Sequence, residues 1–216
     1  MWELNTNLQI ETLLIHDSPA YVVDNFYKEP HKVARYLFNR DIPLYKEGEG
    51  GTDNRNGIDF EDKVFREEKI TPAHAFIETL CGQKPVKGCS ISTNQHRFKC
   101  NNYNRKYQTH YWWAHLDSGY NGIVYFNHDN VNGTNLYNNR IKVEHLPKVA
   151  EGVDPWIPKE HVEFVHHFEP KFNRLVLFDG SKFPHGMAIN NDRYHCKRFV
   201  RAPWNTYRSN QVFFYE

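Results

Sequence analysis

Three residues of this chain could together bind one metal ion: His115 and Asp117, which a single leucine separates, and His185, which follows much later. Two imidazoles and one carboxylate occupy one face of an octahedral ion and leave the other face open, as in non-haem Fe(II) sites that activate dioxygen. Side chains two residues apart on a strand point to the same side, so His115 and Asp117 can enter one pocket. The sequence therefore predicts a metal site with these three residues as ligands.

The chain contains 13 histidines, so a His-x-Asp triplet could arise by chance. The assignment of a metal site therefore depends on the elements around these residues. From about Gly88 onward, short aromatic or β-branched runs alternate with Asn, Asp and Gly turns, a pattern typical of an all-β barrel or sandwich. The predicted strands are Cys89 to Ser92, Arg97 to Cys100, Tyr107 to His115, Gly122 to Asn127, Thr134 to Tyr137, Val162 to His166, Arg174 to Phe178, Gly186 to Ile189 and Gln211 to Tyr215.

The first part of the chain predicts one strand, Ala20 to Phe26, and two helices. The first helix starts at Pro30 and continues from His31 to Asn39, with Val33, Tyr36 and Leu37 on one face. The second has Thr71 as N-cap and Pro72 at its first position, and it ends at Gly82. Its expected buried stripe is Ala75, Phe76, Ile77 and Leu80. The polar segment between the helices, Lys46 to Gly57, reads as a loop that could cover a substrate, and residues 138–160 read as an insertion.

Composition favours one domain over residues 1–216, with helices mainly in 28–82 and a β-core over about 88–216. The formal net charge of +1 provides no broad field for attracting nucleic acid, which makes that partner less favoured. No apolar stretch approaches the roughly 18 residues of a membrane helix, and no secretory leader is evident. The four cysteines form no CxxC pair, so we expect a soluble, cytoplasmic protein without a zinc ribbon.

The segments around the ligands resemble the iron(II)/2-oxoglutarate-dependent oxygenases, in particular their prolyl-hydroxylase-like branch. The likeness runs in order along most of residues 20–215, although only the ligand segments are specific. It rests on Val22 to Val33, Trp113 to Asp117, Gly122 to Asn127, Asn132 to Tyr137, Arg174 to Asp179 and Phe183 to Gly186. The resemblance implies a double-stranded β-helix, or jelly-roll, core of the cupin-like kind, with Fe(II) held by His115, Asp117 and His185.

The resemblance also implies 2-oxoglutarate as co-substrate, whose far carboxylate needs a basic partner. An arginine fork matches a carboxylate bidentately, and in this family that arginine opens the last core strand. The segment Tyr207 to Tyr215 fits that strand, so Arg208 is the first candidate, although it follows His185 at a longer interval than the family's usual short gap. Arg193 and Arg198 remain alternatives. Tyr125 resembles the position whose hydroxyl binds the same carboxylate, although an ordinary barrel aromatic would look the same.

The activity implied is oxidation of a substrate by dioxygen, coupled to decarboxylation of 2-oxoglutarate to succinate, with ascorbate as an auxiliary reductant. The presence of Asp117 favours hydroxylation, because related halogenases lack that carboxylate. The substrate could be a protein side chain, a free amino acid or peptide, a lipid-like molecule, a nucleobase or another small molecule. Two alternatives remain open: a non-enzymatic β-barrel module with Trp112, Trp113, Trp156 and Trp204 as stacking platforms, and a cupin-like hydrolase or isomerase using Zn or Mn.

Overall fold

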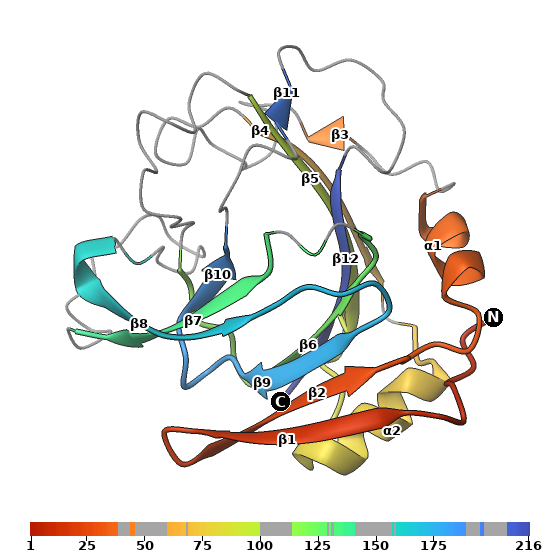
Figure 1. The fold of residues 1–216 in the computed structure, drawn as a ribbon, viewed down its shortest axis with the longest axis horizontal. Helices are drawn as coiled ribbons and strands as arrows, with labels where there is room; N and C mark the ends of the chain where they lie inside the picture. The colour runs from red at the N-terminus through yellow and green to blue at the C-terminus, as the bar shows by residue number, and fades with distance from the viewer. Residues whose placement is uncertain are drawn as a thin grey trace.

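The computed structural model describes both backbone and side chains for residues 1–38, 69–95, 114–128, 130, 132–140, 157, 160–188 and 207–216. For residues 44–45, 60–67, 96–99, 159 and 195–196 it describes the backbone alone. Within these ranges the chain is mainly β, with two α-helices near the N-terminus, as the sequence predicted (Figure 1). The strands form two sheets.

The larger sheet has nine strands and brings segments from both ends of the chain side by side (Figure 1). Adjacent strands in this sheet are antiparallel, except that β11 (His195–Cys196) pairs with β5 in parallel. The order is β1 (Gln9–Ile15), β2 (Ser18–Asp24), β9 (Leu175–Asp179), β6 (Tyr120–Tyr125), β12 (Arg208–Tyr215), β5 (Ile91–Lys99), β4 (Phe60–Glu67) and β3 (Leu44–Tyr45).

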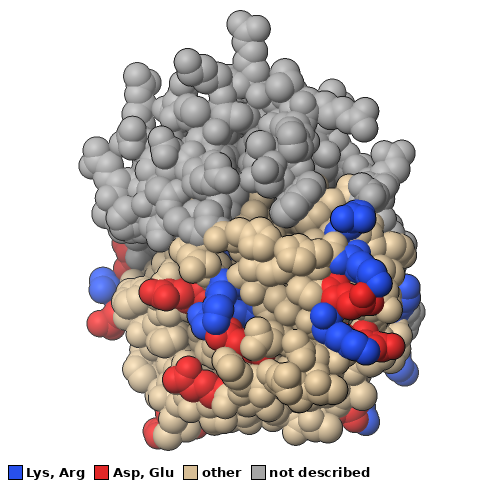
Figure 2. Space-filling view, turned by 45° about the vertical axis from the view of Figure 1, so that its right-hand side comes forward, with Lys and Arg blue, Asp and Glu red and all other residues tan. Residues whose placement is uncertain are grey.

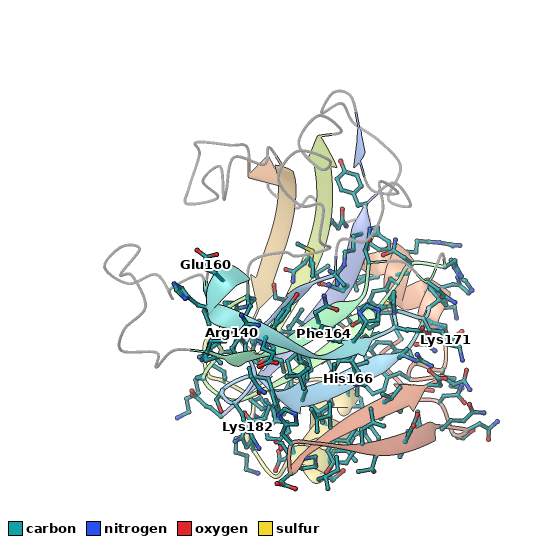
Figure 3. The ribbon with its side chains drawn as sticks, turned by 60° about the vertical axis from the view of Figure 1, so that its left-hand side comes forward. Arg140, Glu160, Phe164, His166, Lys171 and Lys182 are labelled. Carbon is teal, nitrogen blue, oxygen red and sulfur yellow. The ribbon has the colours of Figure 1, made fainter. Side chains whose placement is uncertain are left out.

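The smaller sheet has the order β10 (His185–Met187), β7 (Thr134–Asn139) and β8 (Val162–Phe168), all antiparallel. A single 3-10 turn, η3 (Lys159–His161), leads into β8. Figure 3 shows Phe164 and His166 along β8 on its near side, and Phe164 is 58% exposed there. The β7–β8 register shifts between Leu136 and Tyr137.

The core lies on both faces of the larger sheet. On β6, β9 and β12, odd-numbered and even-numbered residues alternate between the two faces, as strand geometry requires. One face packs against the two helices through Val124, Leu175, Leu177, Phe213 and Tyr215. The other face packs against the smaller sheet, where Ile123, Tyr125, Val176, Phe178 and Val212 meet Leu136 and Phe168. We call this second face the inner face, because both sheets contribute to it.

Both predicted helices form close to their expected bounds. Helix α1 spans Pro30–Phe38 and buries Val33 and Leu37, and α2 spans Pro72–Cys81 with Thr71 as N-cap. Gly82 ends α2 in the left-handed conformation at φ 71°, which glycine adopts at little cost.

The predicted buried stripe of α2 was partly wrong. Ile77 is buried, and Phe76 and Leu80 pack partly against the core, but Ala75 is exposed. The residues that face the sheet with Ile77 are Ala73 and His74, one turn earlier on the same side of the helix.

The sheet extends beyond the predicted β-core, because β1, β2, β3 and β4 precede residue 88. Strand β4 has the sequence FEDKVFRE, in which charged residues outnumber the apolar residues that would indicate a strand. Strand β1 lies at the edge of the sheet and is mostly exposed, so its buried and exposed residues hardly alternate. The two strands predicted around residues 89–100 form one continuous strand, β5. The residues between the two predicted strands belong to the sheet, and Thr93 and Gln95 are buried there.

Charges of both signs are interspersed on the face in Figure 2, over the part of the chain that the structure describes. Among the described residues, ion pairs join Lys28 to Glu3 and Lys171 to Asp24. Neither described helix is both long and apolar enough to cross a membrane.

Candidate metal centre

Backbone pairing places the two predicted histidine ligands directly opposite each other. His115 and His185 form an isolated antiparallel bridge, in which the His115 N–H donates to the His185 carbonyl at 3.0 Å and the His185 N–H donates back at 2.8 Å. On its other side, His185 pairs with Leu136, a residue of the inner face. Because paired residues share a face, both imidazoles project from the smaller sheet toward the larger one.

Asp117 is held next to the histidines by a second strand end. Its backbone N–H donates to the Gly180 carbonyl at 3.0 Å, just after β9, and the Gly180 N–H donates to the Gly119 carbonyl at 2.8 Å. Asp117 Oδ1 then lies 3.9 Å from His115 Nε2, and Asp117 Oδ2 lies 3.4 Å from His185 Nε2. The end of β9 therefore holds Asp117 beside the two histidines, which the backbone bridge between His115 and His185 brings together.

The three candidate ligand atoms all lie within 4.8 Å of one another, so this group could hold a metal ion. The predicted convergence of His115, Asp117 and His185 is confirmed. His185 is only 4% exposed, whereas the side chains of His115 and Asp117 are partly exposed.

The surroundings of His185 fix which ring nitrogen faces the site. Nδ1 lies 3.1 Å from the Phe183 carbonyl, which can only accept a hydrogen bond, so Nδ1 carries the hydrogen. In the neutral ring, Nε2 then keeps its lone pair and points at Asp117. A partner of this kind on the remote nitrogen also orients histidine ligands in known metal sites. Phe178 packs edge-on against the ring, with 4.9 Å between centroids.

The Asp117 carboxyl is held in its ionised, ligand-competent form. Burial alone would raise the pKa of this carboxyl, but the hydrogen bond and charge that His185 provides when its ring is protonated, the charge of protonated His115 and the amide of Asn121 outweigh it. The net effect holds the pKa of Asp117 well below its ordinary value.

Arg208 is buried at the start of β12, with 3% exposure, so it is not a surface arginine. Its Nε donates to the Asn132 carbonyl at 2.7 Å and its Nη2 to the Gly133 carbonyl at 3.0 Å. Its guanidinium carbon lies 5.9 Å from the centre of the Tyr125 ring. The Tyr125 hydroxyl in turn donates to Thr134 Oγ1 at 2.7 Å. Arg208 and Tyr125, both predicted as co-substrate residues, are therefore neighbours.

Gly133 is needed at the Arg208 end of the site. A Cβ there would lie 2.0 Å from the Phe168 carbonyl oxygen, so only glycine lets β7 begin this close to β8. The Gly133 carbonyl is thereby held where it accepts from Arg208.

The Arg208 group lies a short way along the strands from the metal ligands. His185 pairs with Leu136, and Met187, two residues further along β10, pairs with Thr134, which lies two residues earlier on β7. Two residues on a strand cover about 7 Å. Thr134 already contacts Tyr125, beside Arg208, so the inner face carries a candidate metal site and a buried cation within a few residues of each other.

Several predicted features lie outside the described residues. These are Arg193, Arg198, the strand from Tyr107 up to Trp113, the loop Lys46 to Gly57, Trp112, Trp156, Trp204 and most of residues 138–160.

Asn121, which sequence reasoning did not select, is part of the site. It is 2% exposed on β6, and its Nδ2 donates to Asp117 Oδ2 and lies 3.3 Å from His185 Nε2. The sequence does contain a signal for it. Asn121 precedes Ile123 by two positions and Tyr125 by four, so on an extended strand its side chain points to the same face as theirs.

No protein-family model matches this chain, and no curated protein sequence matches it significantly.

Proposed function

We propose that this protein is an Fe(II)/2-oxoglutarate-dependent dioxygenase, a hydroxylase, built on a double-stranded β-helix core. The observation that carries the proposal is the His115, Asp117 and His185 group on an inner face that also holds the buried Arg208. A metal site alone would fit many proteins. A metal site beside a buried guanidinium suits a co-substrate that chelates the metal at one end and carries a carboxylate at the other.

The donor set fits Fe(II). Two imidazoles and an ionised carboxylate suit a borderline metal, and the neutral tautomer that Phe183 enforces makes His185 Nε2 ready to bind it. Iron with bound 2-oxoglutarate supplies the oxidative decarboxylation, to succinate and carbon dioxide, that activates dioxygen for hydroxylation.

The residues of the chain would bind and orient the reactants. His115, Asp117 and His185 hold the metal from one side and leave the other open. Arg208 binds the distal carboxylate of the co-substrate, and the Tyr125 hydroxyl hydrogen can turn from Thr134 Oγ1 to the same carboxylate. Buried Phe178 and Phe183 line the inner face and limit the entry of water.

An anaerobic titration of Fe(II)-loaded protein with 2-oxoglutarate tests the proposal without a known substrate. A keto acid chelated to Fe(II) gives a weak visible charge-transfer band. We expect this band in the wild type and its loss in His185→Ala. The matched control is His167→Ala, which removes a partly buried histidine from the neighbouring strand β8, where it contacts Asn135 rather than the ligands. This control is expected to keep the band.

Absence of a band from wild-type protein with bound iron would overturn the 2-oxoglutarate proposal. It would favour a cupin-like metal protein with another chemistry. Absence of metal binding as well would favour a non-enzymatic β-barrel module.

A further inference from the structure

Asn121 is placed to control how the Asp117 carboxylate binds a metal. Its Nδ2 donates to Asp117 Oδ2, whereas Asp117 Oδ1 faces His115 Nε2 at 3.9 Å. The two oxygens of the carboxylate are therefore in different environments. Oδ2 accepts a hydrogen bond from a buried amide and lies 3.4 Å from His185 Nε2, whereas Oδ1 lies nearest to the other imidazole, that of His115.

The Asn121 side chain has little freedom to move away. It projects from β6, which is paired on both sides, by β9 and β12. A Cβ added to Gly180 would lie 2.6 Å from Asn121 Oδ1 and 3.0 Å from the Gly119 carbonyl oxygen. The Asn121 amide thus fills the space that the missing side chain of Gly180 leaves. The same Gly180 carbonyl accepts from the Asp117 backbone, so the carboxylate and its amide partner are fixed to one frame.

We propose that Asn121 is a positioning residue that makes Asp117 a one-oxygen ligand by occupying Oδ2 and leaving Oδ1 for the metal. This inference rests on the proposed function. An octahedral ion bound by two imidazoles and one carboxylate oxygen keeps three open positions, two for a chelating keto acid and one for dioxygen. A carboxylate that bound through both oxygens would take one of these positions. Asn121 therefore preserves the open face on which the proposed reaction depends.

The test uses Co(II) alone as the first probe, because its visible absorption reports coordination number and geometry without any turnover. Asn121→Leu keeps the branching and the number of side-chain heavy atoms and removes the donor. Asn121→Ala is a second variant in case leucine does not pack. We expect both to bind Co(II) about 10- to 100-fold more weakly than wild type, the usual effect of losing a hydrogen-bond partner of a metal ligand. We also expect a changed Co(II) spectrum and a reduced spectral response to added 2-oxoglutarate.

Two further variants separate positioning from packing. Asn135→Ala removes another buried asparagine amide, on the neighbouring strand β7, whose partners are Tyr137 and His167. Its Co(II) spectrum and affinity are expected to match wild type. Gly180→Ala keeps Asn121 but displaces its amide, so it is expected to reproduce the spectral change of Asn121→Leu.

The outcomes distinguish this inference from the proposed function. A Co(II) spectrum that is identical in wild type, Asn121→Leu and Asn121→Ala would overturn the role of Asn121 and leave the dioxygenase proposal intact. Wild-type protein that binds Co(II) but shows no response to 2-oxoglutarate would overturn the proposed function, while the comparison of Co(II) spectra still decides the role of Asn121. Wild-type protein that binds no Co(II) would overturn both.

Discussion

Replacing Arg208 by methionine removes a buried guanidinium and leaves an unbranched apolar side chain in its place. The guanidinium is 3% exposed and donates to the carbonyls of Asn132 and Gly133. In the proposed function it also binds the distal carboxylate of 2-oxoglutarate. The substitution therefore affects both the free energy of unfolding and the affinity for 2-oxoglutarate.

The expected loss of affinity follows from the kind of bond removed. A hydrogen bond to a charged group contributes about 1.5–3 kcal/mol, and about 1.4 kcal/mol corresponds to a tenfold change in Kd. Arg208→Met should therefore weaken 2-oxoglutarate binding by about 10- to 150-fold. The free energy of unfolding should fall as well, because the Asn132 and Gly133 carbonyls lose their donors at about 1–3 kcal/mol each, which is offset in part because a charge is no longer buried.

A comparison of two keto acids isolates the role of the carboxylate. 2-Oxopentanoate has the same five-carbon chain and the same chelating end as 2-oxoglutarate, but it lacks the distal carboxylate. In anaerobic titrations of Fe(II)-loaded protein, wild type should prefer 2-oxoglutarate, and Arg208→Met should bind the two acids with similar affinity. Arg208→Lys should lie between them, because lysine keeps the charge but loses the planar fork.

Two results would refute this reasoning. Equal weakening of both keto acids would mean that Arg208 supports the fold of the site rather than the carboxylate. Undiminished binding of 2-oxoglutarate would move the anchor to Arg193 or Arg198, which the structure does not describe.

Three further outcomes are expected. Asp117→Ala should abolish the proposed oxygenase reaction, because the candidate metal group loses its carboxylate; dioxygen uptake with 2-oxoglutarate measures this, and an unimpaired variant would remove Asp117 from the site. Asn173→Ala should lower the free energy of unfolding in urea by about 2–5 kcal/mol, since its side chain pairs with both the N–H and the carbonyl of buried Tyr27, and each unpaired group costs about 1–3 kcal/mol; a loss below about 1 kcal/mol would contradict this. His74 should make unfolding pH-dependent: burial lowers its pKa in the folded state, so the unfolded chain takes up its proton first, and stability should fall as the pH drops below about 6.5, with the loss complete below the folded pKa. Urea unfolding of wild type and His74→Gln at pH 8 and 5.5 checks this, and equal pH dependence of the two proteins would exclude His74 as the cause.

Local signals in the sequence were sufficient for the helices and for the metal ligands. Pro30, the Thr71-Pro72 pair and Gly82 act within a turn of the chain, so the ends of both helices could be predicted. The two-residue spacing of His115 and Asp117 is equally local. The pairing of His115 with His185 joins distant parts of the chain, but it follows once both segments are assigned to neighbouring strands.

The features that sequence reasoning missed depend on contacts between distant segments. Strand β4 is charged along its length and belongs to the sheet because β5 pairs with it over eight residue pairs. Asn121 lies just before the predicted strand Gly122 to Asn127, and only its approach to Asp117 gives it a role. The burial of Arg208 likewise depends on the carbonyls of Asn132 and Gly133, far away in the sequence.

The reciprocal hydrogen bonds between the backbones of His115 and His185 have a consequence for how the site is assembled. The separation of the two imidazoles is determined by the width of a strand pair, and the length of chain between them does not enter. Insertions or deletions in that interval that leave Asp117 and the strands intact would therefore leave the spacing of the two imidazoles unchanged. For the same reason the distance between the two rings is set when these two segments pair during folding.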